Sequence, residues 1–386
     1  MRELNYSEIP LLRLEYTEED ITFIQSGIAE ILKSGYLTMG EKVKNFEKQF
    51  SEFIGVRYAI GVNSGTSALE IILRALDVAG KSIVIPTITF MATPLAAIHA
   101  GAKVIFVDVS TDDLSIDPID LKQKIRDDTV AVIAVHIGGI ISSSWDKIRE
   151  ICDESDLFLI EDAAHAHGAS IESKMAGSLG VAGAFSFYPT KVLTTAEGGM
   201  ITTDDDRIYE ISLALREHGK KTPKFNLHTE LGYNWRFSEI HALLGLLEMK
   251  KCNSIIKERR KFAKLYDQLL EDVEGLKCIS LSENIISPYY KYIVYLDEKY
   301  DRETIKKKLK EDFNISLPGE VYSEPCHSQP VFKKYPELIL NGPNDLFPGA
   351  QYVSDRQICL PLYPSLIDDE LRYVVDSLKV VLKSLD

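Results

Sequence analysis

Short apolar segments alternate with helical stretches from Tyr58 onward, and this alternation restricts the possible folds more than any other feature of the sequence. Each segment is only a few residues long, is almost continuously hydrophobic, and leads through turn residues into an amphipathic stretch. Strands read this way when helices cover both faces of a parallel sheet. The predicted strands are Tyr58–Val62, Ser82–Ile85, Val104–Val109, Thr129–Val135 and Asp156–Ile160. The sequence therefore predicts an α/β fold, with a three-layer large domain built on a mostly parallel sheet.

The pattern changes after about Ser238, where a long helix begins and strands no longer alternate regularly with helices. A strand is expected at Tyr289–Leu296, and helices are expected at Arg302–Glu311 and Asp368–Leu385. Such a mixture is typical of a separate, smaller α+β domain. We accordingly divide the chain into an N-terminal arm (residues 1–16), a large domain (17–250) and a small C-terminal domain (251–386).

Composition excludes several classes of function. The chain has 386 residues, a net charge of −14 and no basic stripe, which argues against nucleic acid as a partner. No apolar stretch is long enough to span a bilayer, and the first residues show no apolar signal region, so we expect no membrane association. The five cysteines are scattered and form no CxxC pair, which suggests reduced thiols and a cytoplasmic location.

Lys191 follows a further predicted strand, Ala184–Phe187, which must end at Pro189 because proline lacks the ladder donor. Its neighbours are apolar or hydroxylic, and Gly198-Gly199 allows a tight turn before the next strand. Desolvation there would lower the pKa of the lysine amine and make it nucleophilic, as a Schiff-base lysine requires. A lysine that only extends from a loop to solvent explains this stretch equally well.

Asp162 resolves that ambiguity. The apolar run Asp156–Ile160 ends in Glu161 and Asp162, and ligands of open α/β sheets bind at the carboxyl ends of strands. A strand-end acid and a desolvated lysine match the arrangement that holds pyridoxal 5′-phosphate (PLP). The lysine takes the aldehyde, and the aspartate keeps the pyridine nitrogen protonated. The pair Lys191 and Asp162 therefore predicts PLP as the cofactor.

A phosphate site is expected at Asn63–Ser67, between a strand and a helix, where free N–H groups and the helix dipole attract anions. Gly65 permits a close approach, and the Thr66 and Ser67 hydroxyls add donors. The stretch alone would fit an ordinary helix cap, and it is neither a Walker loop nor a GxGxxG fingerprint. Phe90 follows a strand end and is a candidate to stack on a flat ring, although a core phenylalanine is the default interpretation.

A rival hypothesis is a metal-dependent hydrolase. Glu161, Asp162, His165 and His167 lie close together in sequence, and acids and histidines at such spacing can bind a metal ion. No further histidine cluster supports such a site, so we expect no metal.

Taken together, these motifs resemble the DegT-type nucleotide-sugar aminotransferases, within fold type I of the PLP enzymes. The resemblance covers nearly the whole chain, and its motifs occur in the family's order. They are Gly35–Gly40 with Val43 and Phe46-Glu47, Asn63–Thr66, Glu161–Ala164, Phe185–Lys191, Glu197–Gly199, Leu231–Arg236 and Gln329–Phe332.

The resemblance implies a role for each candidate site residue. Lys191 and Asp162 would be catalytic, and Phe90 would stack on the cofactor ring. His165 stands beside the ring hydroxyl, where most members have glutamine, and Trp235 stands where tyrosine is usual. His327 would lie near the sugar. The phosphate would be bound by Gly65, Thr66, Ser67 and Ser186, joined by Asn234 from the partner subunit of a homodimer with shared active sites.

The activity implied by the resemblance is transamination of a nucleotide-linked keto-deoxysugar, with L-glutamate as the amino donor. The product would be an amino sugar for a surface glycan or polysaccharide. Family members that dehydrate the sugar carry histidine in place of the lysine, so Lys191 favours transamination. We favour a 4-keto substrate. The alternatives are a 3-keto sugar aminotransferase and a regulatory protein that binds PLP without turnover.

Overall fold

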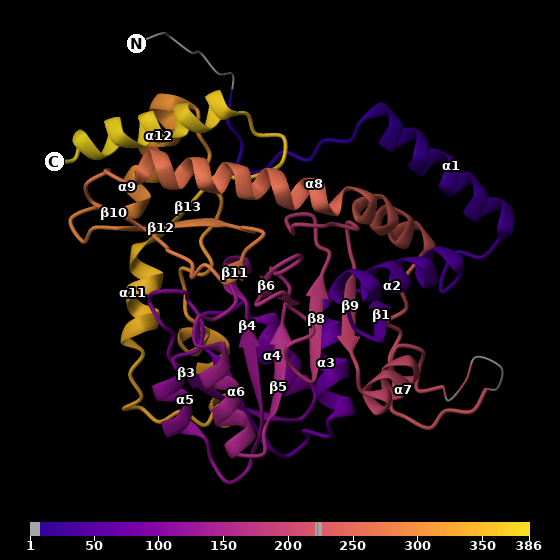
Figure 1. Cartoon of the computed structure of the whole chain (residues 1–386). Helices are drawn as coiled ribbons and strands as arrows, with labels where there is room; N and C mark the ends of the chain where they lie inside the picture. The colour runs from indigo at the N-terminus through magenta and orange to yellow at the C-terminus, as the bar shows by residue number, and fades with distance from the viewer. Residues whose placement is uncertain (1–7, 221, 223–225) are drawn as a thin grey trace.

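A seven-stranded sheet lies at the centre of the computed structural model, which describes residues 8–220, 222 and 226–386 (Figure 1). Its strand order is β1-β9-β8-β5-β4-β2-β3, and only β9 runs antiparallel to its neighbours. The strands are β1 (Tyr58–Val62), β2 (Ser82–Pro86), β3 (Lys103–Val107), β4 (Thr129–Val135), β5 (Phe158–Asp162), β8 (Ala182–Ser186) and β9 (Gly199–Thr203). The mostly parallel α/β sheet predicted from the sequence is confirmed.

Helices cover both faces of this sheet, and strands such as β2 and β9 are therefore buried along their whole length. Helix α3 packs against α4, α7, β8 and β9, and α2 packs against α8 and β1. The helices of this part are α1 (Glu18–Ser34), α2 (Glu41–Ile54), α3 (Gly65–Ala75), α4 (Ala92–His99), α5 (Pro118–Lys124), η1 (Ile137–Gly139), α6 (Trp145–Glu154) and α7 (Asp206–Leu215).

The predicted ends of the first helix are both present. Thr17 caps α1 and accepts a hydrogen bond from the Asp20 backbone N–H, and Gly35 ends the helix with a positive φ of 73°. The strand predicted at Asp156–Ile160 lies two residues further along, at Phe158–Asp162, because Glu161 and Asp162 pair with Ala134 and Val135 of β4. The two acids thus belong to the strand itself and point to opposite faces of the sheet.

A second core lies above the central sheet (Figure 1). The antiparallel sheet β10-β12-β13 packs there against α9, α12 and the second half of α8, and the pair β6-β7 joins β11 nearby. The elements are α8 (Glu239–Leu270), β10 (Leu276–Cys278), β11 (Ile285–Ile286), β12 (Tyr292–Leu296), α9 (Arg302–Phe313), η2 (Cys326–Ser328), α10 (Pro330–Lys334), η3 (Pro336–Leu338), α11 (Pro348–Arg356), β13 (Gln357–Leu360) and α12 (Asp368–Lys383), with β6 (Ser170–Ile171) and β7 (Lys174–Met175) from the earlier part of the chain.

Helix α8 belongs to both cores. Cys252, Ile255 and Ile256 pack in the first core, whereas Phe262 and Tyr266 pack in the second. The division at residue 250 thus falls inside a continuous helix, and it stays a prediction. Of the predicted N-terminal arm, residues 1–7 lie outside the described residues. Ile9 is fully buried in the second core and forms a bridge with Ile315.

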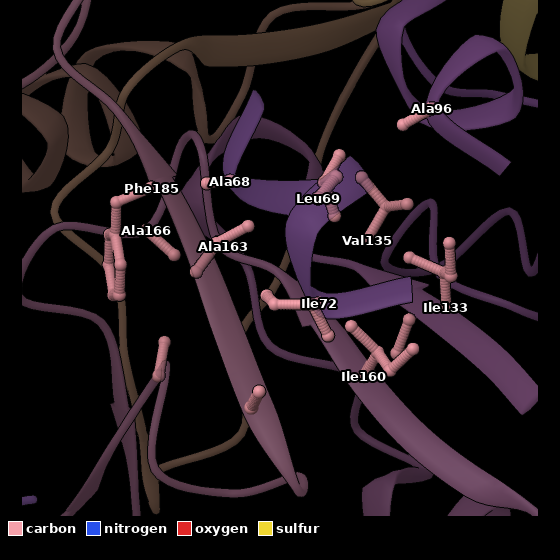
Figure 2. Packing of buried hydrophobic residues seen from close by; sticks show 14 of the residues in the cluster. Ala68, Leu69, Ile72, Ala96, Ile133, Val135, Ile160, Ala163, Ala166 and Phe185 are labelled. Atoms are coloured by element: carbon pink, nitrogen blue, oxygen red, sulfur yellow. The ribbon is translucent and has the colours of Figure 1, made fainter. Parts of the chain in front are cut away.

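The packing of α3 positions the loop at its N-terminus. Figure 2 shows Leu69 and Ile72 of this helix facing the strand residues Ile133, Val135 and Ile160, all of them buried. This apolar contact holds the first turn of α3 against the carboxyl ends of the strands, where the predicted phosphate site lies. Among the residues described, none of the helices combines the length and apolarity needed to cross a membrane.

Candidate active site

A cavity of about 480 Å³ opens at the carboxyl ends of β4, β5 and β8. Its floor is formed by the ends of these strands and by the first turn of α3, and two tyrosines of the C-terminal part close one side. The lining residues are Ser64, Gly65, Thr66, Leu69, Thr89, Phe90, Ala92, Val135, Ile137, Asp162, Ala164, His165, Ser186, Tyr188, Thr190, Lys191, Glu197, Tyr290 and Tyr322.

Lys191 enters the cavity from the loop that follows β8. Its backbone N–H donates to the Tyr188 carbonyl at 2.9 Å, which closes a tight turn just after Pro189. Burial lowers the pKa of its amine to about 8, the nearby Asp162 charge opposes that shift, and Lys291 adds to it. The amine also lies 4.9 Å from the centroid of the Tyr290 ring. At pH 7 about a tenth of Lys191 is therefore neutral and nucleophilic, far more than of an ordinary lysine.

Asp162 faces the same cavity and is only 6% exposed. Its Oδ2 accepts a hydrogen bond from Thr93 Oγ1 at 2.7 Å, and its Oδ1 accepts one from the Ala164 N–H at 3.2 Å. Burial raises the pKa of this carboxyl, and the two hydrogen bonds and Lys191 oppose the rise. The structure thus brings the two predicted catalytic residues into one cavity.

Glu161, next to Asp162 in sequence, points to the other face of the sheet and has no exposed surface. Its Oε1 accepts hydrogen bonds from the Leu179 and Gly180 N–H groups, and its Oε2 accepts one from Gly177 and lies 2.9 Å from His136 Nε2. The carboxylate is thus fully engaged in holding the loop between β7 and β8.

His167, another residue of the rival metal site, does not line the cavity either. The His167 ring packs against Phe185 and Phe187, and burial lowers its pKa to about 3. Across the described part of the chain, no group of three or more histidine, cysteine, aspartate or glutamate side chains is placed to hold a metal ion. The geometry of these residues therefore gives the hydrolase hypothesis no support.

The first turn of α3 forms a cradle for an anion. Gly65, Thr66 and Ser186 all line the cavity, and a Cβ on Gly65 would come within 2.8 Å of Ser186 Cβ, so only glycine fits there. Ser67, predicted to bind phosphate, instead hydrogen-bonds Asn63 Oδ1 at 2.5 Å and does not line the cavity. Ser64 lies at the cavity wall in its place.

His165 and Phe90 lie on the cavity wall, as expected. Phe90 is 60% exposed, and its ring lies 5.8 Å from that of Tyr322, which leaves a face free to stack on a ligand. The His165 ring stacks on Tyr290 at 4.0 Å, and its Nδ1 accepts a hydrogen bond from the Gly138 N–H at 3.4 Å. Burial holds the pKa of His165 well below its usual value, so the ring is neutral and Nε2 carries the proton.

Two predicted residues lie elsewhere. His327 does not line the cavity: its Nδ1 lies 2.7 Å from Thr87 Oγ1, and its ring stacks on Phe347 at 4.1 Å. Asn234 is exposed, outside the cavity of its own subunit, and its backbone bridges to Glu217. Its predicted role toward a partner subunit stays a prediction.

Sequence reasoning missed several lining residues, chiefly Tyr290 and Tyr322. Both lie far along the chain from β5 and β8, and they reach the cavity because the C-terminal segments that carry them pack against the core of the central sheet. The doublet Tyr289-Tyr290 at the start of a predicted strand was the only signal in the sequence, and it does not distinguish a cavity wall from a core.

Known proteins are similar to this chain in both sequence and fold. The model of the DegT/DnrJ/EryC1/StrS aminotransferase family matches residues 18–379. The spore coat polysaccharide biosynthesis protein SpsC of Bacillus subtilis is 33% identical, over 99% of this chain and 98% of its own. The UDP-4-amino-4,6-dideoxy-N-acetyl-beta-L-altrosamine transaminase of Campylobacter jejuni is 29% identical, over 96% and 98%. The crystal structure of NtdA from Bacillus subtilis with bound cofactor PMP superposes with a TM-score of 0.89 at 26% identity, over 99% and 87%.

Proposed function

Because the chain belongs to the DegT/DnrJ/EryC1/StrS aminotransferase family and is thus a PLP-dependent enzyme, we propose that Lys191 and Asp162 carry its transamination reaction. The observation that supports this most directly is their placement in one cavity beside an anion cradle. The proposed substrates are a nucleotide-linked keto-deoxysugar and L-glutamate, and the proposed product is an amino sugar.

The residues present fit PLP group by group. The cradle of Gly65, Thr66 and Ser186 suits the phosphate, and the exposed ring of Phe90 suits the face of the pyridine. Asp162 is the acceptor for the protonated ring nitrogen, and the Nε2–H of His165 is a donor for the ring hydroxyl. When bound, PLP supplies an electron sink for the carbanion that forms on the donor's α-carbon.

Lys191 is proposed to act twice. With the cofactor bound, its amine would hold the aldehyde, and once freed by the donor amine it would carry a proton from the donor's α-carbon to the cofactor. A base for this step should have a pKa near the operating pH, and burial brings Lys191 to about 8. Asp162 holds the ring nitrogen in its charged form while this proton moves.

The proposed sugar is a 4-keto-deoxysugar, and its amino product is proposed to enter a surface glycan or polysaccharide. The names of two relatives support these choices: the Campylobacter protein is a 4-amino sugar transaminase, and SpsC is a spore coat polysaccharide biosynthesis protein. The test is to incubate the enzyme with glutamate and a panel of nucleotide-linked 3-keto and 4-keto sugars. A product with the mass of the amino sugar, formed only from 4-keto compounds, is expected, whereas amination of 3-keto compounds alone would contradict the assignment.

The location proposed is the cytoplasm, where nucleotide sugars and glutamate would be available. The five cysteines are all free, and four of them are buried. This pattern is consistent with a reducing compartment.

The rate of PLP capture should depend on the pKa of Lys191. For the apo protein, we expect the rate of lysine adduct formation to rise about tenfold per pH unit below pH 8 and to level off above it, because only the neutral amine attacks. An ordinary lysine, with a pKa of 10.5, would give a rate that still rises above that point. The measurement is borohydride trapping at timed intervals, followed by peptide mapping. If the rate of adduct formation reached no plateau below about pH 10, the argument that burial lowers the pKa of Lys191 would be contradicted.

The enzyme is proposed to be a homodimer in which Asn234 reaches the partner's cofactor phosphate. Asn234 lies in an exposed loop before α8, outside its own cavity, and the neighbouring Leu231 is 89% exposed. A neutral amide donor suits a phosphate dianion, and a large exposed apolar side chain is typical of a surface covered by another chain.

A mixed dimer tests this sharing. Asn234→Asp places like charge against the partner's phosphate, whereas Lys191→Ala disables its own subunit. A heterodimer of the two variants then has both defects in one site and leaves the other intact. Differently tagged subunits, co-expressed and isolated, should therefore recover about half of the wild-type activity per dimer. If Asn234 served its own subunit, each site would carry one defect and the heterodimer would be as inactive as its folded parents.

A further inference from the structure

Two threonines connect the Asp162 carboxylate to the loop that follows β2. Thr93, in the first turn of α4, has no exposed surface, and its hydroxyl lies 2.7 Å from Asp162 Oδ2. Thr89 is 3% exposed, and its Oγ1 lies 2.7 Å from Thr93 Oγ1. Thr89 lines the cavity and Thr93 does not, and neither has a role in the site as described above.

The hydrogen bonds of this chain can run in only one direction when Asp162 is ionised. A hydroxyl has a single proton to donate, and an ionised carboxylate can only accept. Thr93 therefore gives its proton to Asp162, and its oxygen must accept the proton of Thr89. Each bond in such a chain polarises the next, and a hydrogen bond to a charged acceptor is stronger than a neutral one.

The hydrogen-bond chain from Thr89 through Thr93 also opposes the effect of burial on the pKa of Asp162. Burial raises the pKa of Asp162, and the hydrogen bond from Thr93 is the largest opposing influence, ahead of the Ala164 N–H and Lys191. A carboxylate that became neutral could not keep a ring nitrogen charged. The buried acid therefore depends on its donors to remain ionised.

Thr89, at which the hydrogen-bond chain begins, is held in place by a residue from the C-terminal part of the molecule. Cys326 donates its Sγ–H to the Thr89 carbonyl at 3.1 Å and its backbone N–H to the Thr87 carbonyl at 2.7 Å. Cys326 thus fixes the backbone of the loop at Thr87 and Thr89, so the hydroxyl that begins the hydrogen-bond chain has a defined position.

We propose that Thr93, oriented by Thr89, is a positioning residue that keeps Asp162 ionised and directed at the cofactor's ring nitrogen. Thr93 acts through Asp162 and does not line the cavity. The proposal rests on the proposed function, because it assumes that Asp162 pairs with the ring nitrogen. It predicts that the proton shared by the two groups moves toward Asp162 when the hydroxyl of Thr93 is removed.

The test compares Thr93→Val with Thr93→Ser in protein loaded with PLP labelled with ¹⁵N in the ring. The ring-nitrogen chemical shift reports whether that nitrogen is protonated. Loss of a hydrogen bond to a charged group should raise the proton affinity of Asp162 about tenfold or more, so the ring nitrogen of the valine variant should titrate about one pH unit lower. Its kcat should fall about tenfold with little change in KM, and serine should restore both quantities.

Melting temperature and PLP content of each variant separate this effect from a packing defect. Equal changes in the serine and valine variants, or an unchanged ¹⁵N signal in PLP-loaded Thr93→Val, would overturn the role of Thr93. If Thr93→Val does not fold, Thr89→Val is compared with Thr89→Ser, because Thr89 lines the cavity and serine keeps its hydroxyl. Only the valine change removes the donor to Thr93. It should move the ring-nitrogen titration in the same direction by less, and an unmoved titration would overturn the proposal. A wild-type protein that took up no PLP would instead refute the proposed function itself.

Discussion

Replacing Lys191 by alanine should lower the rate of transamination by at least about 10³-fold, the largest effect expected from any single substitution in this chain. Two functions are lost together, because the side chain that takes the aldehyde is also the base that moves the proton. The anion cradle and the Phe90 ring are untouched, so the variant should still bind PLP without a covalent link. Single-turnover absorbance with glutamate measures the lost rate, and borohydride treatment should leave no pyridoxyl group on the 191 peptide.

Lys291→Ala is the matched control. Lys291 lies over the same Tyr290 ring, its amine 5.4 Å from the centroid, but it does not line the cavity. This variant should keep the Lys191 adduct, and the pKa of Lys191 should rise, because the Lys291 charge is among the influences that lower it. Partial recovery of the alanine variant by an added small amine would support the proton-transfer role. Wild-type turnover in Lys191→Ala would refute the assignment of the catalytic lysine.

Asp162→Asn should give the second largest effect, a loss of several hundredfold in kcat. The amide has nearly the shape of the carboxylate but no charge to hold the ring nitrogen protonated, so the carbanion loses its sink. Removal of one preorganised electrostatic partner typically costs about 3–4 kcal/mol of barrier. The fold should survive, because the Asn oxygen can still accept from the Ala164 N–H, and the Asn NH2 can donate to the Thr93 hydroxyl, whose proton then turns toward Thr89. Steady-state kinetics and the ring-nitrogen chemical shift are the measurements.

Asp113→Asn provides a comparison for the general cost of neutralising a buried acid. Asp113 is 4% exposed and accepts hydrogen bonds from Ser115 and Ser143, outside the cavity. Its replacement should lower the melting temperature without changing kcat in the folded fraction. If Asp162→Asn behaved like Asp113→Asn, with normal turnover and only reduced stability, Asp162 would be a structural acid at a strand end.

The alternation of apolar strands with helices was enough to predict the central sheet, because a strand buried on both faces must be apolar throughout. The same local reasoning located Lys191 and Asp162. Each follows or ends an apolar strand, and the carboxyl ends of neighbouring parallel strands meet at one edge of the sheet. The positions of these two residues at the ends of predicted strands were therefore enough to predict that they lie close together.

Other features depended on contacts that local sequence does not contain. Ser64 and Ser67 are the same residue type within one helical turn, but Ser64 caps α3 and lines the cavity, whereas the Ser67 hydroxyl bonds to Asn63 and lies outside it. Tyr290 reaches the cavity because the segment before β12 packs into the core of the central sheet. Thr93 reaches Asp162 because α4 begins after β2, at the same edge of the sheet at which β5 ends. A strand pattern records burial along one segment. The direction of a side chain in a cavity is decided by the elements packed around it, which come from distant parts of the chain.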